Sequence, residues 1–211
     1  MRPPREAVRR LWHGGPDPHT VHLVFIVAAA DLKGDGKRHD SESVAKALRR
    51  VGADVVVLTN CEHGSGSRIK RQARYEQIES ATGAPAVTVL ANRTLRRCPE
   101  RPDATLLCEV RIAERRTRVA AGTEEPLELY RLLIELESDD PLVVVGSFDV
   151  DLNNPSTIAE LHAHDTLDSK SPSRTGGTRT SGIVTRGLHT YGAGEYHSDD
   201  GLVVCWIRVG Y

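Results

Sequence analysis

The stretch PLVVVGSFDVDLNNP (141–155) joins an apolar strand to a group of polar side chains. The run from Leu142 to Val145 predicts a strand that is buried on both faces. Gly146 follows at once, and the polar residues after it are Ser147, Asp149, Asp151, Asn153 and Asn154. A strand end that delivers carboxylates and amides to one place is a common way to build a binding or catalytic site.

Other segments show the same alternation of apolar strands and capped helices. Strands are predicted at 21–31, 53–60, 85–92, 104–123 (two strands with a tight turn near 114–116), 182–188 and 201–211. Helices are predicted at 41–52, 126–138 and 155–167, and a loop followed by a helix is predicted at 64–83. Asp40 or Ser41 can cap the first helix, and Gly52 ends it. This order predicts an α/β protein.

Composition limits the classes of partner. The chain has 211 residues, of which 39% are hydrophobic and 27% charged, as expected for one globular domain with a real core. Its formal net charge of -1 gives no general attraction to nucleic acid or to an anionic membrane, so neither partner is expected. No apolar run reaches the ~18 residues that a membrane span needs.

The two ends of the chain differ in character. Residues 1–20 contain four prolines and two glycines without periodicity, which predicts an irregular lead-in before a single domain at 21–211. They lack the apolar segment of a secretion signal, so we expect a cytoplasmic protein with reduced thiols. The composition, rich in Arg, Ala and Gly, is typical of bacterial proteins from GC-rich genomes. The four thiols are Cys61, Cys98, Cys108 and Cys205.

Five short motifs follow predicted strands in a fixed order. They are AAADLKGDG (28–36), ADVVVLTNCE (53–62), AAGTEEPLELYRLL (120–133), GSFD (146–149) and HSDDGLVVCWI (197–207). In this order they resemble the endonuclease/exonuclease/phosphatase superfamily, the DNase I-like proteins, over about residues 21–208. The resemblance implies a four-layered α/β sandwich of two packed mixed β-sheets flanked by helices.

The residues at the family's active positions differ from the family pattern. Asp31 stands where the family has a metal-binding Asn, and Asn60 where it has a metal-binding Glu. The family's GDFN is GSFD here, so that Ser147 and Asp149 replace its Asp and Asn. The remaining departures are Glu124 at one family His, Asp200 at the His of SDH, and Gly182 at a late Asp; Asp199 is the retained Asp of SDH.

These substitutions argue against ordinary phosphodiester chemistry, which needs a hard cation on carboxylate oxygens and donors for the phosphoryl group. Asn60 is a weaker ligand than a carboxylate, and Glu124 and Asp200 repel phosphate. The chain is instead expected to gather five carboxylates in one pocket: Asp31, Glu124, Asp149, Asp199 and Asp200. Crowding raises the pKa of some of them, which creates an acid and a base without a metal cofactor.

Roles follow from this expectation. Asp149 or Asp199 is the predicted base, and Asp200 or Glu124 the predicted acid. His197 lies two residues before Asp199, so in a strand both would share a face. The predicted substrate-binding residues are Asn60, Ser147, His197, Arg174 and Arg179, the two arginines lying in a Gly/Ser/Thr-rich loop at 169–182 that can reach over the site. Asp31 and Asn60 also fit a purely structural role at strand ends.

Three functions remain open from the sequence. The first is an enzyme of small-molecule biosynthesis that uses carboxylate acid/base catalysis on a nuclease-like scaffold. The second is a phosphodiesterase, phosphatase or nuclease that uses Mg²⁺ or another divalent cation with altered ligands. The third is a binding protein that has kept the scaffold and lost catalysis. Hydrolysis of a phosphoester that EDTA abolishes would indicate the second.

Overall fold

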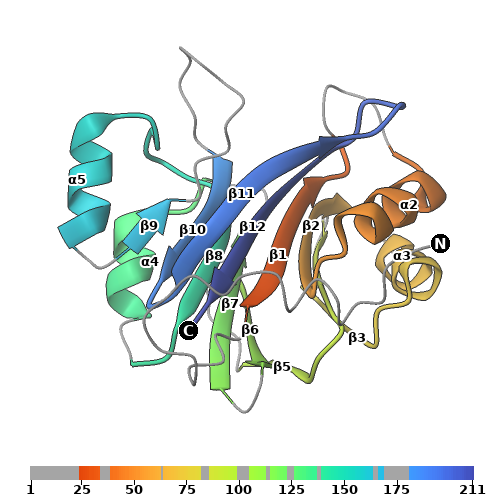
Figure 1. Cartoon of the computed structure of the whole chain (residues 1–211), viewed down its shortest axis with the longest axis horizontal. Coiled ribbons are helices and arrows are strands. Elements are labelled where there is room, and N and C mark those ends of the chain that lie inside the picture. Colours follow the sequence, from red (N-terminus) through yellow and green to blue (C-terminus); the bar gives the residue numbers. More distant parts are fainter. Residues whose placement is uncertain are drawn as a thin grey trace.

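Two six-stranded sheets pack face to face in the computed structural model, with helices on both outer sides (Figure 1). The structure describes residues 24–33, 39–62, 64–81, 86–98, 105–112, 115–122, 126–136, 139–163, 166–168 and 181–211. The predicted lead-in at 1–20 lies outside these residues, as do Glu124, Arg174 and Arg179. None of the helices described is long and apolar enough to cross a membrane.

The first sheet contains both ends of the described chain. Its spatial order is β11 (His189–His197), β12 (Val203–Gly210), β1 (Val24–Asp31), β2 (Val55–Cys61), β4 (Ala86–Ala91) and β3 (Gln77–Ser80). Only β1 and β2 run parallel among these pairs, with Asp31 beside Thr59. The parallel pair needs a crossover, and α2 supplies it.

The second sheet also mixes parallel and antiparallel pairs. Its spatial order is β5 (Leu95–Arg97), β6 (Thr105–Ile112), β7 (Arg115–Gly122), β8 (Leu142–Ser147), β10 (Ser181–Arg186) and β9 (Thr166–Asp168). β7 and β8 are its parallel pair, and the other pairs are antiparallel. The apolar run of the opening stretch is therefore a central strand, as its uninterrupted hydrophobicity predicts.

Two helices lie on each outer side among the described residues. They are α2 (Ser41–Val51) and α3 (Ser65–Ala73) beside the first sheet, and α4 (Leu129–Glu135) and α5 (Pro155–Ala163) beside the second. Asp40 is the N-cap of α2, and Gly52 ends that helix in the left-handed region at φ 71°. Both ends of α2 thus follow from local sequence signals.

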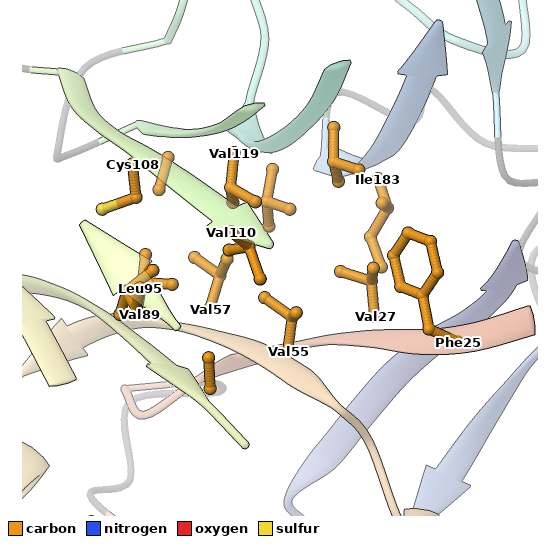
Figure 2. Close-up of a cluster of buried hydrophobic side chains, with 14 of the residues drawn as sticks. Phe25, Val27, Val55, Val57, Val89, Leu95, Cys108, Val110, Val119 and Ile183 are labelled. Atoms are coloured by element: carbon orange, nitrogen blue, oxygen red, sulfur yellow. The ribbon is translucent and has the colours of Figure 1, made fainter. Parts of the chain in front are cut away.

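Three apolar clusters lie between the layers. One fills the space between the sheets and includes Val27, Val57, Val119 and Ile183 (Figure 2). The second packs the first sheet against α2 and α3, and the third packs the second sheet against α4 and α5. This arrangement is the four-layered α/β sandwich that the motif order implied.

Several element boundaries differ from the predictions. The helix expected over 64–83 ends at Ala73, and its second part is strand β3. Arg74 adopts φ 64° at that point, so the chain turns back along the sheet edge. The helix expected over 155–167 likewise ends at Ala163 and is followed by β9. β5 and β11 were not predicted, because short or polar edge strands carry little apolar pattern.

Candidate functional site

The two sheets run in the same sense, which brings four strand ends to one edge of the sandwich. Tyr211 shows this alignment, because its ring lies against Phe25 at the start of β1 and its hydroxyl hydrogen-bonds Thr117 at the start of β7. The carboxyl ends of β1, β2, β7 and β8 therefore lie at the opposite edge. We call this the carboxyl edge; the β11–β12 turn at 198–202 lies there as well, since β12 runs antiparallel to β1.

Asp31 and Asn60 meet at the carboxyl edge. The Asn60 Nδ2 donates a hydrogen bond of 2.7 Å to Asp31 Oδ1, which also accepts one of 3.0 Å from the Lys33 amide. Asn60 has φ 55° and sits where the pairing of β2 with β4 shifts register. Left-handed backbone is more accessible to Asn than to most residues. The bulge turns the Asn60 amide toward Asp31, so the two strand ends form one polar pair.

Asp149 has a structural contact that the sequence did not predict. Its Oδ1 accepts a hydrogen bond of 3.1 Å from the Leu129 amide in the first turn of α4. The loop backbone fixes this geometry, because Leu127 donates to the Ser147 carbonyl and accepts from the Asp149 amide. Asp149 and Ser147 are both exposed. One carboxylate oxygen of Asp149 is thus used to anchor α4.

The expected alignment of His197 with Asp199 does not occur. Strand β11 ends at His197, and the Gly201 amide closes a tight turn on the Ser198 carbonyl. Asp199 therefore lies in a turn, where the two-residue period of a strand no longer applies. His197 Nε2 lies 3.1 Å from Glu195 Oε2 on its own strand. The argument that placed His197 beside Asp199 is wrong on this point.

Asp200 does not have the raised pKa expected of a crowded acid. The Ser198 hydroxyl, and after it Ser43 and His39, hold the pKa of Asp200 below its usual value by hydrogen bonding to the carboxylate. A carboxylate with a lowered pKa is ionised at neutral pH and has no proton to give. The expectation of a raised pKa, and with it the role of Asp200 as the acid, is therefore corrected.

His39 is the residue that the sequence analysis missed. Its Nδ1 lies 3.5 Å from Asp200 Oδ2, and its side chain is only 5% exposed. The His39 amide bonds the Leu32 carbonyl, which closes the loop after β1. Imidazole and carboxylate thus come from two loops far apart in sequence. The one available signal was a histidine directly before a helix cap, at the end of a loop that follows a site strand.

The site acids form separate small groups within the described residues. Asp31 is bound to Asn60, Asp149 to α4, and Asp200 to His39. No group of three or more His, Cys, Asp or Glu in the described part of the chain is arranged to hold a metal ion. The arrangement can place the His39 imidazole against the Asp200 carboxylate and can orient a ligand at Asp31, Asn60 and Asp149.

Comparison with known proteins identifies the fold. No family model and no curated protein sequence matches the chain. An endonuclease/exonuclease/phosphatase family protein from Leptotrichia buccalis superposes with a TM-score of 0.62 and 8% identity, covering 89% of this chain and 100% of that chain. A similar protein from Beutenbergia cavernae gives 0.64 and 10%, covering 89% and 72%.

A third likeness is to a humanized D. rerio TDP2 with 14 mutations. It gives a TM-score of 0.66 at 11% identity and covers 90% of this chain and 100% of that chain. The chain therefore has the endonuclease/exonuclease/phosphatase, or DNase I-like, fold. At identities this low the likeness establishes the fold alone, so activity has to be argued from the residues.

Proposed function

We propose that the chain is an enzyme that acts on a small molecule by general acid/base catalysis at the carboxyl edge. The observation that carries the proposal is the buried His39 imidazole beside the Asp200 carboxylate, with 3.5 Å between Nδ1 and Oδ2. An ionised carboxylate orients a neighbouring imidazole, and an oriented imidazole is a common general acid or base. In this proposal His39 exchanges the proton with substrate, and Asp200 holds the ring in place.

The other acids act in binding and as a second base. Asp149 and Asp199 are exposed and keep the role of base predicted for them, while Asp31 and Asn60 orient a polar group of the substrate. We place the reaction in bacterial small-molecule biosynthesis, in the cytoplasm and without a metal cofactor. The hydrogen bond between Asn60 and Asp31 supports the absence of a metal cofactor from this proposal. The Asn60 Nδ2 donates to Asp31 Oδ1 and so occupies a carboxylate oxygen that a cation would otherwise use.

The proposal is tested by metabolite turnover. Metal-stripped protein is incubated in EDTA with a bacterial small-molecule extract, and consumption and formation of compounds are followed by mass spectrometry. We expect at least one compound to be converted, and His39→Gln to slow that conversion by about 100-fold or more, the usual contribution of a general acid/base. Asp139→Asn is the matched control, since Asp139 is exposed and precedes β8 at the other end of that strand.

Other outcomes support the alternatives. Conversion of phosphoesters that needs Mg²⁺ and stops in EDTA would establish the metal-dependent hydrolase. Ligand binding without any conversion, weakened by changes at Asp31 or Asp149, would establish a binding protein. Circular dichroism of each variant separates loss of function from loss of fold.

A further inference from the structure

Helices α2 and α3 together present a strongly basic outer surface. They pack against each other, and the Arg49 Nη1 donates a hydrogen bond of 2.5 Å to the Gln72 carbonyl. The basic side chains are Lys46, Arg49 and Arg50 on α2, Arg68, Lys70 and Arg71 on α3, and Arg74 at its C-cap. All are exposed except Lys70, which is half-buried. We call these seven residues the basic face.

Within the described residues, no acidic side chain neutralises the positive charge of the basic face. Glu42, in the first turn of α2, is the sole acidic residue within the two helices. No ion pair joins any residue of the basic face to an acid in the described part of the chain. By contrast, Arg111 and Arg116 on the second sheet both approach Glu109, at 3.9 and 3.7 Å.

Stabilisation by the helix dipole explains the presence of only some of these basic residues. A cation in the last turn of a helix is stabilised by the helix dipole, which covers Arg49 and Arg50 on α2 and Lys70 and Arg71 on α3. Lys46 and Arg68 lie a turn earlier. Like charges three and four residues apart on one helix face destabilise the helix by about 0.2–0.5 kcal/mol per pair. A group of positive charges without acidic partners favours the binding of an external anion.

The basic face lies away from the carboxyl edge except at Arg68, which is in the first turn of α3. α2 crosses back between parallel strands, so it begins at the carboxyl edge with Asp40 and ends at the other end of the sheet. α3 follows β2 in the same direction, and the contact of Arg49 with Gln72 places the last turns of both helices together. Figure 1 shows the two helices side by side on the outer side of the first sheet.

We propose that the basic face binds the phosphate backbone of a nucleic acid without reading its sequence. Five of its seven residues are arginines, whose guanidinium groups match phosphate oxygens in a bidentate way. The face has no exposed aromatic residue on which a base could stack, so the contact is with the backbone. It has no large exposed apolar side chain to insert into a bilayer, which favours nucleic acid over a membrane surface.

Fluorescence anisotropy with a labelled DNA duplex of about 20 base pairs tests the proposal. We expect binding at about 50 mM salt that weakens steeply by about 200 mM, because released counterions drive it. The variant Lys46→Gln/Arg50→Gln/Arg68→Gln/Arg71→Gln should bind at least about tenfold more weakly. The slope of log affinity against log salt should become shallower by about 3–4, because each phosphate that is no longer neutralised reduces it by about 0.9.

The matched control removes four charges elsewhere. Arg93→Gln/Arg96→Gln/Arg111→Gln/Arg116→Gln changes exposed arginines outside α2 and α3, two of which approach Glu109. The proposal is overturned if this control weakens binding as much as the basic-face variant, if the wild-type protein does not bind the duplex, or if vesicles with anionic lipid are bound in its place. None of the changed residues belongs to the carboxyl edge, so conversion of a small molecule serves as an independent check.

Discussion

Asp40 stabilises the start of α2 through both of its carboxylate oxygens. Oδ1 accepts hydrogen bonds from the Glu42 and Ser43 amides at 2.9 and 3.0 Å, and Oδ2 accepts one from the Ser43 hydroxyl at 2.8 Å. We expect Asp40→Ala to lower the free energy of unfolding by about 1 kcal/mol at pH 7, as for other helix caps. Ser41→Ala is the control and should change it little, because Asp40 and not Ser41 is the cap.

The effect of Asp40 should depend on pH in a defined direction. The Ser43 amide and hydroxyl lower the pKa of Asp40 in the folded protein. A group with a lowered folded pKa contributes stability above its unfolded pKa of about 3.9, and that contribution is lost as pH falls through the folded value. The difference between wild type and Asp40→Ala in urea unfolding should therefore shrink between about pH 5 and pH 2. A difference that grows in acid would contradict this account.

The sequence predicted which polar residues lie at the site, but it did not predict which residues they contact. The sequence placed polar side chains after the strands that end at Asp31, Asn60 and Ser147, and those strand ends do share one edge. It did not predict that Asp149 would bind the Leu129 amide, or that His39 would lie against Asp200. Each of these contacts joins segments far apart in the chain, for which local periodicity carries no signal.

At the scale of elements, Arg186 of β10 caps the end of α4. Its Nη1 donates to the Leu133 carbonyl at 2.8 Å and its Nη2 to the Leu136 carbonyl at 2.6 Å. These carbonyl groups lie at the C-terminal end of α4, where the carbonyls of a helix have no amide partner within the helix itself. We expect Arg186→Met to lower the free energy of unfolding by about 2 kcal/mol, the usual value of one hydrogen bond to a charged group.

Arg131, which is itself a residue of α4, provides the comparison for Arg186. Its side chain is 62% exposed and pairs with Glu135 at 2.8 Å. Exposed pairs of this kind contribute about 0.5 kcal/mol or less, so Arg131→Met should be nearly neutral in urea unfolding. Equal losses in the two variants would show that the carbonyl contacts of Arg186 do not stabilise α4.

On the scale of the whole molecule, the core between the sheets should make both unfold together. Leu106 of β6 is 1% exposed and belongs to that core, whereas Trp206 lies on the first sheet. In a Trp12→Phe background Trp206 is the sole tryptophan. There, Leu106→Ala should lower stability by about 3 kcal/mol, and the Trp206 fluorescence and far-ultraviolet dichroism transitions in urea should coincide.

The alternative outcome for the core is a two-step transition. If Leu106→Ala shifted the dichroism transition and left the Trp206 transition in place, the sheets would be independent units. Ile134→Ala is the control for a change of similar size at the surface, because Ile134 is 61% exposed. It should alter stability by less than about 0.5 kcal/mol.

Charge shows why whole-chain quantities are a poor guide to surfaces. The net charge of -1 led us to expect no nucleic-acid partner. The folded chain nonetheless places seven basic residues close together on the basic face, whereas Asp31, Asp149, Asp199 and Asp200 lie at the carboxyl edge. A sum over the sequence cancels these two regions, whereas an approaching ligand responds to the nearer one, because salt screens charges beyond about 8–10 Å.

The sequence by itself determined the class of fold, the central strands and the ends of α2, because these depend on apolar runs and caps within a few residues of one another. Tertiary structure alone decided the short edge strands β5 and β9, the anchoring of Asp149, and the meeting of His39 with Asp200. The reason is physical in each case. An edge strand or a side-chain contact gains its free energy from a partner supplied by another segment, and that partner is in place only once the tertiary structure has formed.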